Sequence, residues 1–217
     1  MSKLDDLRRQ FRLRKRNRER KRRLHQGARA RREARSVRKL RRRIRKLLRA
    51  LSAPRLQYDS VSVQNIPRDA KAAAYYVDGL YENEAAVKQR APKARYTSIA
   101  VFSSGEADCL DIEPGNASVA EAPGWYRKMK LQRPKRKPIF YIGAATADEL
   151  VHTLAEHGIK RSDYILWTAH YGAGKHFCGE GSCPYARSAG RVDSTQFTTN
   201  NETLDESVCR PSFWERG

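Results

Sequence analysis

The order of apolar and polar residues after position 53 predicts short strands separated by helices. Eight runs rich in β-branched and aromatic residues have the length of strands, at 57–63, 74–78, 97–102, 109–113, 138–143, 164–169, 194–198 and 204–209. Helical patterns fall between some of them, at 82–90, 118–132 and 147–157. This alternation favours a mostly parallel α/β sheet, and eight strands favour a small or incomplete (β/α) barrel of the TIM type.

Two stretches do not fit a regular barrel. Only residues 103–108 join the third and fourth predicted strands, whereas a parallel crossover normally needs about a dozen residues. We therefore expect either that this pair of strands is antiparallel or that one of them is misplaced. Residues 172–193 also carry no helical pattern, so the barrel is expected to be irregular.

The first 52 residues follow a different pattern. Apolar residues spaced three and four apart, as in an amphipathic helix, occupy its second half at Val37, Leu40, Ile44, Leu47 and Leu51. The block 12–23 has Leu13 as its only hydrophobic residue. Because like charges repel, this block is predicted to be poorly ordered on its own.

The charge of the chain divides at the same place. The 217 residues include 45 Lys and Arg against 24 Asp and Glu, a net charge of +21. Residues 1–52 hold 24 basic and 4 acidic residues, which leaves 21 basic and 20 acidic residues, a net charge of +1, for the remainder. We therefore predict a basic, partly helical N-terminal arm at 1–53 and a barrel domain at 54–217.

The closely spaced guanidinium groups of the arm predict that residues 1–52 bind a polyanion, because they displace counterions from phosphates. Nucleic acid, a wall polymer and an anionic membrane surface all fit that chemistry, and the stripe at 37–51 also fits a helix lying on a membrane. A solvated tether without a ligand is the alternative. No apolar run approaches the roughly 18 residues that span a bilayer, and the charged segment 8–23 replaces the apolar core of a signal peptide. We expect neither a transmembrane segment nor a signal peptide.

The most informative acids lie on the fourth predicted strand. Asp111 and Glu113 alternate with apolar neighbours, so both point to one face of the strand. The dipeptide 114–115, Pro-Gly, ends the strand directly after Glu113. In a barrel, the carboxyl ends of the strands form the active-site face. Three further acids lie near strand ends, and the alternative for all five is loop capping or pairing with Lys and Arg: Asp59, Asp78 and Asp205.

Several short motifs together resemble a known family. In chain order they are Asp59-Ser60, Tyr76-Val77-Asp78-Gly79, Leu110-Asp111-Ile112-Glu113, Trp167-Thr168-Ala169-His170-Tyr171, Gln196-Phe197-Thr198 and Asp205. They are similar to the glycoside-hydrolase-like barrel domains of actinobacteria and their phages, which are related to the family 25 lysozymes. The resemblance covers roughly residues 58–214 and excludes the arm. The domain is shorter than a full family 25 barrel, with helices missing after the third and sixth strands.

The resemblance implies an endolysin-like hydrolase that cleaves the glycan strands of peptidoglycan without a cofactor or metal. Glu113 would be the general acid and Asp111 the carboxylate that stabilises the oxocarbenium-like centre, while Asp59 and Asp205 line the same pocket. The expected substrate-binding residues are Asp78, Tyr76, Trp167, Tyr171 and Gln196, of which the three aromatic residues fit core packing equally well. Such a protein would be made in the cytoplasm and act at the bacterial cell wall, or be carried in a virion. The competing interpretation is a non-catalytic virion or wall-binding protein whose arm binds nucleic acid.

The cysteines leave three interpretations open. Cys178 and Cys183 enclose a short glycine-containing loop that a disulfide would close. His170 and His176 precede them, and the H-x-C-x4-C spacing is close to that of a metal site, although it is looser than paired C-x2-C motifs. Plain structural thiols are the third interpretation. The sequence favours the disulfide and no metal.

Overall fold

The computed structural model describes residues 13–21, 37–42, 44, 53–200 and 203–215. The chain divides into two compact units, Met1–Ser52 and Ala53–Gly217. This division lies one residue from the boundary that the charge distribution predicts.

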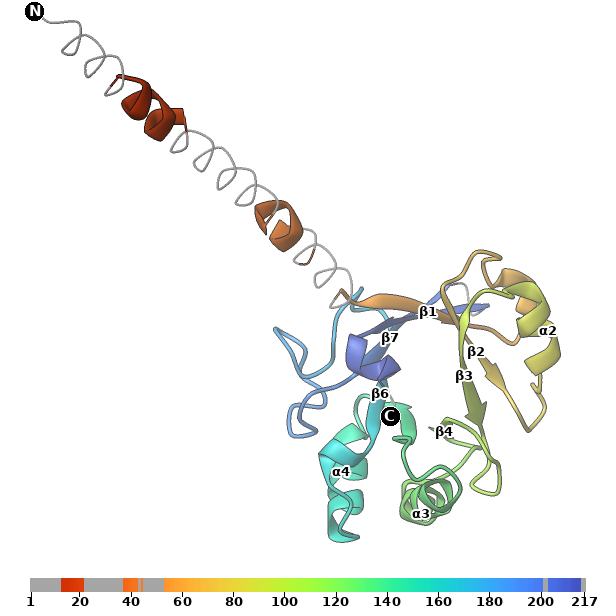
Figure 1. Cartoon of the computed structure of the whole chain (residues 1–217). Helices are drawn as coiled ribbons and strands as arrows, with labels where there is room; N and C mark the ends of the chain where they lie inside the picture. The colour runs from red at the N-terminus through yellow and green to blue at the C-terminus, as the bar shows by residue number, and fades with distance from the viewer. Residues whose placement is uncertain (1–12, 22–36, 43, 45–52, 201–202, 216–217) are drawn as a thin grey trace, which may run out of the picture. The chain divides into compact units, whose positions relative to one another are not determined.

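The second unit is built on a closed barrel of eight strands in chain order (Figure 1). The strands are β1 (Arg55–Asp59), β2 (Ala72–Tyr76), β3 (Arg95–Ala100), β4 (Cys109–Ile112), β5 (Ile139–Gly143), β6 (Ile165–Ala169), β7 (Ser194–Asn200) and β8 (Leu204–Cys209). Neighbours from β1 to β7 are parallel, whereas β8 runs antiparallel to both β7 and β1. The predicted α/β barrel is confirmed, but its sheet is closed rather than incomplete.

The helices form only a partial outer layer (Figure 1). The α-helices of the barrel unit are α2 (Glu84–Arg90), α3 (Ala122–Gln132) and α4 (Ala147–Glu156), which follow β2, β4 and β5. The short 3₁₀ helices are η1 (Val63–Asn65), η2 (Val119–Glu121), η3 (Arg161–Asp163) and η4 (Pro211–Trp214). No helix lies between β3 and β4, and none lies between β6 and β7, as the sequence predicts.

Alternation along the strands divides the apolar side chains between two layers. Inside the barrel, one cluster includes Ile139, Tyr141, Ile165 and Trp167, with Phe213 of η4 packed against them. The alternate residues of the same strands face α3 and α4 on the outside, among them Leu110, Phe140 and Leu166. The even–odd pattern that buries these apolar residues also sets the direction of Asp111 and Glu113, which share the parity of inward-facing Cys109.

The connection between β3 and β4 corrects the sequence analysis. The two strands are parallel and β4 begins at its predicted residue, so neither expected explanation is right. Ile99 lies level with Cys109, which means that β4 starts where β3 ends. The chain therefore needs almost no return path, and residues 101–108 suffice without a helix. The Ser98 hydroxyl accepts a hydrogen bond from the backbone N–H of Asp108 at 2.8 Å, which fixes the end of this loop.

The long segment 170–193 between β6 and β7 contains no helix or strand. Part of it packs on the outer cluster through Cys178, Cys183, Ala186 and Val192. Gly179 has a positive φ of 79°, and a Cβ atom there would lie 2.9 Å from the Ala186 carbonyl oxygen. The folded loop thus requires glycine at this position.

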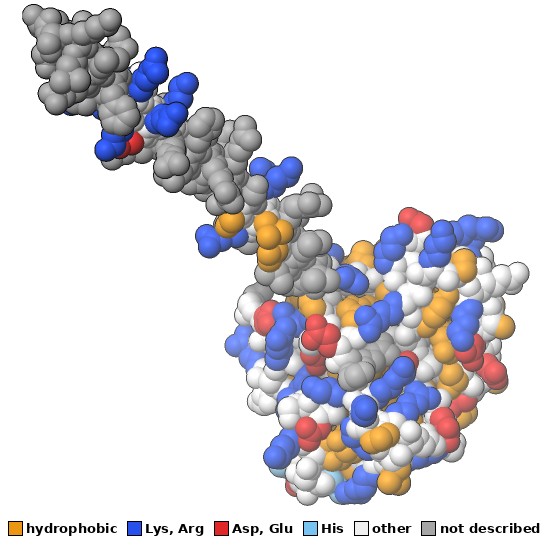
Figure 2. All heavy atoms as spheres, in the orientation of Figure 1, with side chains coloured by type: hydrophobic (Ala, Val, Ile, Leu, Met, Phe, Trp, Pro, Cys, Tyr) orange, Lys and Arg blue, Asp and Glu red, His pale blue; other side chains and the backbone are white. Residues whose placement is uncertain are grey.

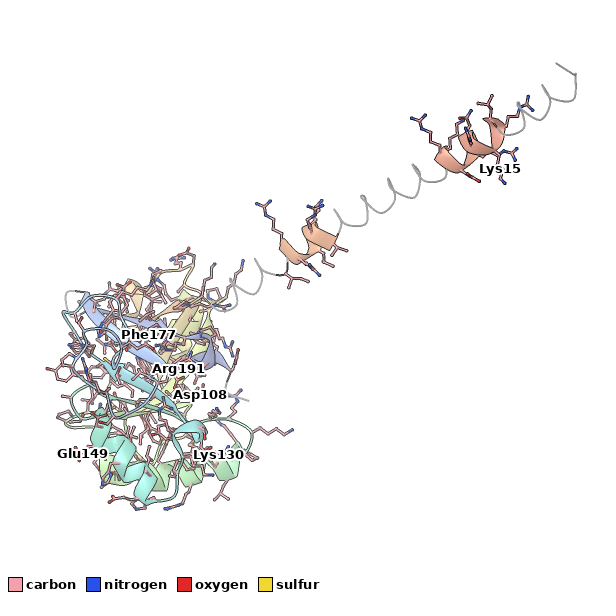
Figure 3. The ribbon with its side chains drawn as sticks, turned by 90° about the vertical axis from the view of Figure 1, so that its left-hand side faces the viewer. Lys15, Asp108, Lys130, Glu149, Phe177 and Arg191 are labelled. Carbon is pink, nitrogen blue, oxygen red and sulfur yellow. The ribbon has the colours of Figure 1, made fainter. Side chains whose placement is uncertain are left out.

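In the arm, residues 13–21 are helical and all of their side chains are exposed. Figure 3 shows these side chains projecting outward from the helix that carries Lys15. This corrects the expectation of a poorly ordered block for that part, since no proline or glycine interrupts it. Residues 37–42 and 44 are also helical, and Val37, Leu40 and Ile44 expose about half of their surface. Leu47 and Leu51 lie outside the described residues.

The two units also differ in surface charge. On the face of the barrel unit seen in Figure 2, Lys and Arg side chains are interspersed with Asp and Glu. In the described part of the arm, residues 13–21 carry six basic side chains and a single acid, Glu19. Among the residues that the structure describes, no helix has both the length and the apolar character needed to cross a bilayer.

Candidate functional site

Four carboxyl groups meet at one end of the barrel. Asp59 is the last residue of β1, Asp111 is next to last in β4, and Glu113 directly follows β4. Asp205 lies near the start of β8, whose antiparallel direction brings its beginning to the carboxyl ends of the other strands, and it pairs directly with Asp59. We call Asp59, Asp111, Glu113 and Asp205 the rim acids. All four were predicted as site residues, and the structure brings them together.

Burial raises the pKa of every rim acid, and repulsion from neighbouring carboxyl groups adds to the effect at Asp59, Asp111 and Asp205. The pKa of Asp59 is well above its usual range because the side chain is buried and because Asp205, Asp111 and Glu113 are close. Burial raises the pKa of Asp111 to about 8, with contributions from Glu113 and Asp78. Burial also raises the pKa of Asp205 to about 6 and, to a smaller extent, that of Glu113. At neutral pH the site therefore holds both protonated and ionised carboxyl groups.

Neutral hydrogen-bond donors surround the rim acids. Asn116 donates from Nδ2 to Asp111 Oδ2 at 3.0 Å. A hydrogen bond from Tyr141 lowers the pKa of Glu113, and one from Tyr76 lowers that of Asp59, in each case against the larger effect of burial. These donors favour the ionised forms without supplying a positive charge.

Gln196 and Tyr171 complete the network of the rim. Gln196 is hydrogen-bonded to Asp205 and donates from Nε2 to the Tyr171 hydroxyl at 3.3 Å. The Tyr171 and Tyr141 hydroxyl oxygens lie 3.0 Å apart. Tyr171 is 46% exposed, so one aromatic face remains available at the edge of a buried polar network.

The rim acids lack cationic partners. No Lys or Arg among residues 53–200 and 203–215 forms an ion pair with any of them. Within the same residues, Asp59 Oδ1 and Asp111 Oδ1 are buried and make no hydrogen bond. Buried polar atoms are rarely left in this state unless a ligand or water completes them. The cluster is therefore arranged to receive a polar group.

Two of the expected substrate-binding residues have other positions. Trp167 is 1% exposed inside the barrel, where its Nε1 donates to Ser207 Oγ at 3.0 Å and its ring packs on Tyr141. It supports the rim from below and offers no face to a ligand. Asp78 accepts a hydrogen bond from the Val101 backbone N–H at 2.7 Å. Its other oxygen packs against Gly105, where any larger residue would collide with it. Asp78 thus shapes the β3–β4 loop and acts on Asp111 through its charge.

Sequence reasoning missed two residues of the site. Tyr141 lies beside Asp111 in the register of β4 and β5 and contacts both Glu113 and Tyr171. Its inward parity, alternating with Phe140 and Ile142, was a readable signal. Asn116 follows the turn after Glu113, and nothing in the sequence indicated that this turn folds back onto Asp111.

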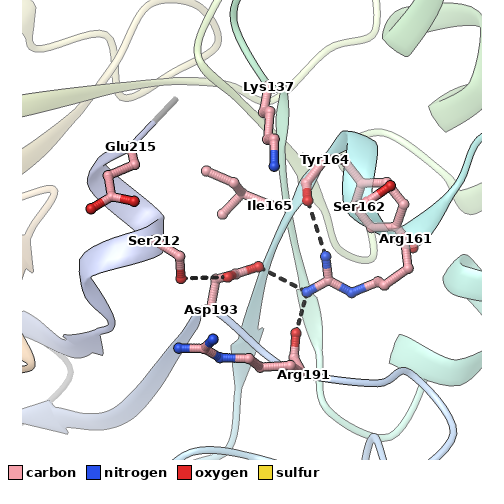
Figure 4. A pocket seen from close by; sticks show the side chains of 9 residues that line it. All are labelled: Lys137, Arg161, Ser162, Tyr164, Ile165, Arg191, Asp193, Ser212 and Glu215. Carbon is pink, nitrogen blue, oxygen red and sulfur yellow. Dashed lines mark hydrogen bonds and ion pairs between the residues drawn. The ribbon is translucent and has the colours of Figure 1, made fainter. Parts of the chain in front are cut away.

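A cavity of about 300 Å³ lies at the opposite end of the barrel (Figure 4). Two of its charged groups bind each other and the backbone: Arg161 Nη2 lies 2.8 Å from Asp193 Oδ2, and Arg161 Nη1 donates to the Tyr164 carbonyl oxygen at 3.0 Å. Ser212 donates to the second Asp193 oxygen at 2.8 Å. Because these groups are satisfied, we interpret this cavity as a structural joint between the 170–193 loop and the barrel.

The predicted disulfide is not formed. Cys178 and Cys183 are free thiols, and each sulfur atom instead faces a histidine of the same loop. Cys178 Sγ lies 3.7 Å from His176 Nε2, and Cys183 Sγ lies 3.5 Å from His170 Nδ1. This cluster is separate from the rim acids and is the group of side chains most suited to hold a metal ion among the described residues.

Comparison with known proteins adds no family to these observations. No family model and no curated protein matches the chain.

Proposed function

We propose that this protein is a peptidoglycan-degrading glycosidase of the lysozyme or endolysin type, and that its barrel is a reduced form of the TIM type. The observation that carries the proposal is the set of rim acids, which share a barrel end without any cationic partner among the described residues. Glycosidases need one protonated and one ionised carboxyl group beside the scissile bond. The raised pKa values of the rim acids meet that need at neutral pH.

Glu113 is the proposed general acid. It follows the end of β4 and is more exposed than the buried Asp59 and Asp111, so a glycosidic oxygen can reach it. At neutral pH, Asp111 with its pKa of about 8 holds a proton. In the proposed reaction Asp111 loses its proton to solvent, and its negative charge then stabilises the positive charge that develops on the sugar ring. The same negative charge holds the proton on Glu113 until Glu113 donates it to the leaving oxygen, because the charges of the two carboxyl groups are coupled.

The remaining rim residues are suited to hold a sugar. Tyr171 presents an exposed aromatic ring, and the apolar face of a sugar can pack on the face of that ring. Tyr76 and Gln196 contact Asp59 and Asp205 and position these carboxyl groups. In this proposal Asp59 and Asp205 accept hydrogen bonds from sugar hydroxyl groups, which would satisfy the unpaired Asp59 oxygen.

The arm is the proposed binding element for an anionic surface. Residues 13–21 and 37–42 expose Arg and Lys side chains, and Val37, Leu40 and Ile44 are exposed beside them. Attachment to a wall polymer or anionic membrane would raise the local concentration of glycan at the barrel. Removal of residues 1–52 should lower activity on intact walls, leave activity on soluble glycan fragments unchanged, and lose its effect at high salt.

The decisive experiment is the release of reducing ends from purified peptidoglycan. Glu113→Gln keeps the size of the side chain and removes its acid, so the rate should fall on the order of a thousandfold. Glu149→Gln, an exposed residue of α4, is the matched control and should keep the wild-type rate. An unchanged rate for Glu113→Gln would contradict the proposal. If neither protein releases reducing ends but both bind walls, the chain is a binding protein.

A further inference from the structure

We propose that His170, His176, Cys178 and Cys183 bind one zinc ion, and that this site fixes the fold of the loop between β6 and β7. The side chains come from fourteen consecutive residues of the loop. One ligand atom from each lies within 4.8 Å of all the others. The proposal does not depend on the glycosidase function.

The distances between the ligand atoms match those of a tetrahedral site. Zinc binds sulfur at about 2.3 Å and imidazole nitrogen at about 2.0–2.1 Å, which places nitrogen and sulfur ligands about 3.6 Å apart in a tetrahedron. The two measured nitrogen–sulfur distances are 3.7 Å, for His176 and Cys178, and 3.5 Å, for His170 and Cys183. The His170 Nδ1 and His176 Nε2 atoms are 2.9 Å apart, and an ion between them requires a shift of only a few tenths of an ångström.

The surroundings of His176 prepare it as a ligand. Its Nδ1 lies 2.7 Å from the carbonyl oxygen of Gly174. Because a carbonyl only accepts, Nδ1 carries the proton and Nε2, which faces His170 and Cys178, presents its lone pair to the centre of the cluster. Metal-bound histidines usually have such a partner on the second ring nitrogen, since it fixes the tautomer and the ring orientation.

The composition of the cluster favours zinc. Two thiolates and two imidazoles form a common tetrahedral set for zinc, whereas magnesium and calcium prefer oxygen ligands. Four protein ligands leave no coordination position for a substrate, which is typical of a structural site. Cys178 and Cys183 are 1% and 7% exposed, and the histidines are partly exposed. The ion would therefore enter from the side of the histidines and then coordinate the buried sulfur atoms.

The loop needs such a support. A long segment without regular structure inside a compact domain is uncommon, and residues 170–193 contain no helix or strand. Its second half is held by Arg161, which forms an ion pair with Asp193 and donates from Nε to the Ala189 carbonyl oxygen at 3.2 Å. The first half contains Gly172 and Gly174, both at positive φ, before His176. In this proposal the bound zinc ion holds that half in place.

The site also connects to the rim. His170 donates from its backbone N–H to the Gln196 carbonyl oxygen at 2.8 Å, and Tyr171 is the next residue. A metal bond to His170 therefore restrains the residue that carries the Tyr171 ring. Zinc in this position would act as a positioning element for the rim without contacting a ligand there.

The test begins with the metal content of the full chain, purified with a reductant and without a chelator. We expect about one zinc per chain in the wild type. Cys178→Ser and His176→Ala should retain almost none, whereas His152→Ala, which removes an exposed histidine of α4, should retain all of it. Wild-type protein that takes up no zinc from added zinc chloride would overturn the proposal. Equal zinc in the Cys178→Ser/Cys183→Ser double variant would overturn it as well.

Three measurements on the wild type keep the test independent of variant folding. Replacement of zinc by cobalt should give the visible absorption of tetrahedral cobalt with a thiolate charge-transfer band. Two thiols missing from unreduced, denatured protein would show a disulfide and would overturn the proposal. Zinc should also slow tryptic cleavage after Lys175 and Arg187, both exposed in the loop. Cleavage at these residues that is equally fast with zinc and with a chelator would show that the ion does not fix the loop.

Discussion

Acidic residues occupy both ends of the barrel, but their partners differ. At the end where β4 and β7 begin, Asp108 forms ion pairs with Arg133 and Arg136, and Asp193 forms one with Arg161. At the opposite end, the rim acids have one another, and no described Lys or Arg forms an ion pair with them. The barrel thus uses the same side-chain chemistry in two electrostatic settings.

Burial alone does not separate the two settings. Asp193 is 8% exposed and Asp111 is 4% exposed, yet burial raises the pKa of Asp111 to about 8, while Asp193 has an arginine partner, a serine donor and the Leu166 backbone N–H. A paired buried acid holds parts of a fold together. Unpaired buried acids destabilise the fold and keep protons available for chemistry.

The largest expected effect on stability comes from the paired end. Asp193→Asn removes the charge that Arg161 faces and leaves that guanidinium group partly buried without its partner. Breaking a buried ion pair in this way should lower the free energy of unfolding by roughly 3 kcal/mol. Urea unfolding measures it, with the exposed Asp69→Asn as the control. A loss as small as that of the control would mean that the joint contributes little.

At the rim the same substitution should act in the opposite direction. Asp111→Asn removes a carboxyl group that burial and Glu113 disfavour as an anion. At pH 8 we expect the free energy of unfolding to rise by roughly 2 kcal/mol, while glycan cleavage falls. The comparison fails if Asp111→Asn destabilises the protein as Asp193→Asn does.

The pH dependence of stability should carry the same signature. The folded-state pKa values of Asp111 and Asp205 are about 8 and about 6, above the usual value of 3.8. Their protonated forms are favoured in the fold, so the stability they contribute is complete below about pH 4 and is lost as the pH rises toward 8. The expected slope is roughly 1 kcal/mol per pH unit between pH 6 and 8. For Asp111→Asn the free energy of unfolding should change less with pH. The difference from the wild type separates the contribution of Asp111 from that of the histidines.

The smallest expected effect concerns the edge of the rim. Tyr171→Phe removes the hydroxyl that contacts Tyr141 and Gln196 but keeps the exposed ring. We expect a loss of less than about 1 kcal/mol in unfolding, and a change in the Michaelis constant for glycan rather than in turnover. Tyr81→Phe, on an exposed ring in the turn before α2, is the matched control. A large loss of turnover would assign Tyr171 a part in the chemistry.

Much of the barrel follows from local sequence pattern. All eight strands and the three α-helices of the barrel unit lie within a few residues of their predicted positions, because alternation and helical periodicity are local properties. The direction of β8 and the short β3–β4 connection were not predictable in this way. Both depend on the register between neighbouring strands, and contacts between residues far apart in the chain decide that register.

The candidate site was also predictable only where it depends on local sequence pattern. The alternation around Leu110 and Ile112 placed Asp111 and Glu113 on one face, and the resemblance placed Asp59 and Asp205 in the same pocket, where the structure brings the four acids together. The sequence could not show that Arg161 and its counterparts lie at the other end, which decides whether an acid is paired. For Trp167 the structure supports the core-packing alternative, which the sequence could not separate from a ligand-binding role because both place the side chain on the inner face of the strand.

The position of the antiparallel β8 at the end of the chain affects how the protein folds during its synthesis. Asp59 and Asp205 are direct partners across β1 and β8, the first and last strands of the domain. Such a long-range pairing forms late in folding, since nearly the whole domain must first be in place. On the ribosome, the rim acids cannot assemble until β8 has left the exit tunnel. A chain cut short before residue 204 should therefore contain seven of the eight barrel strands but lack Asp205, and so be unable to assemble the complete set of rim acids.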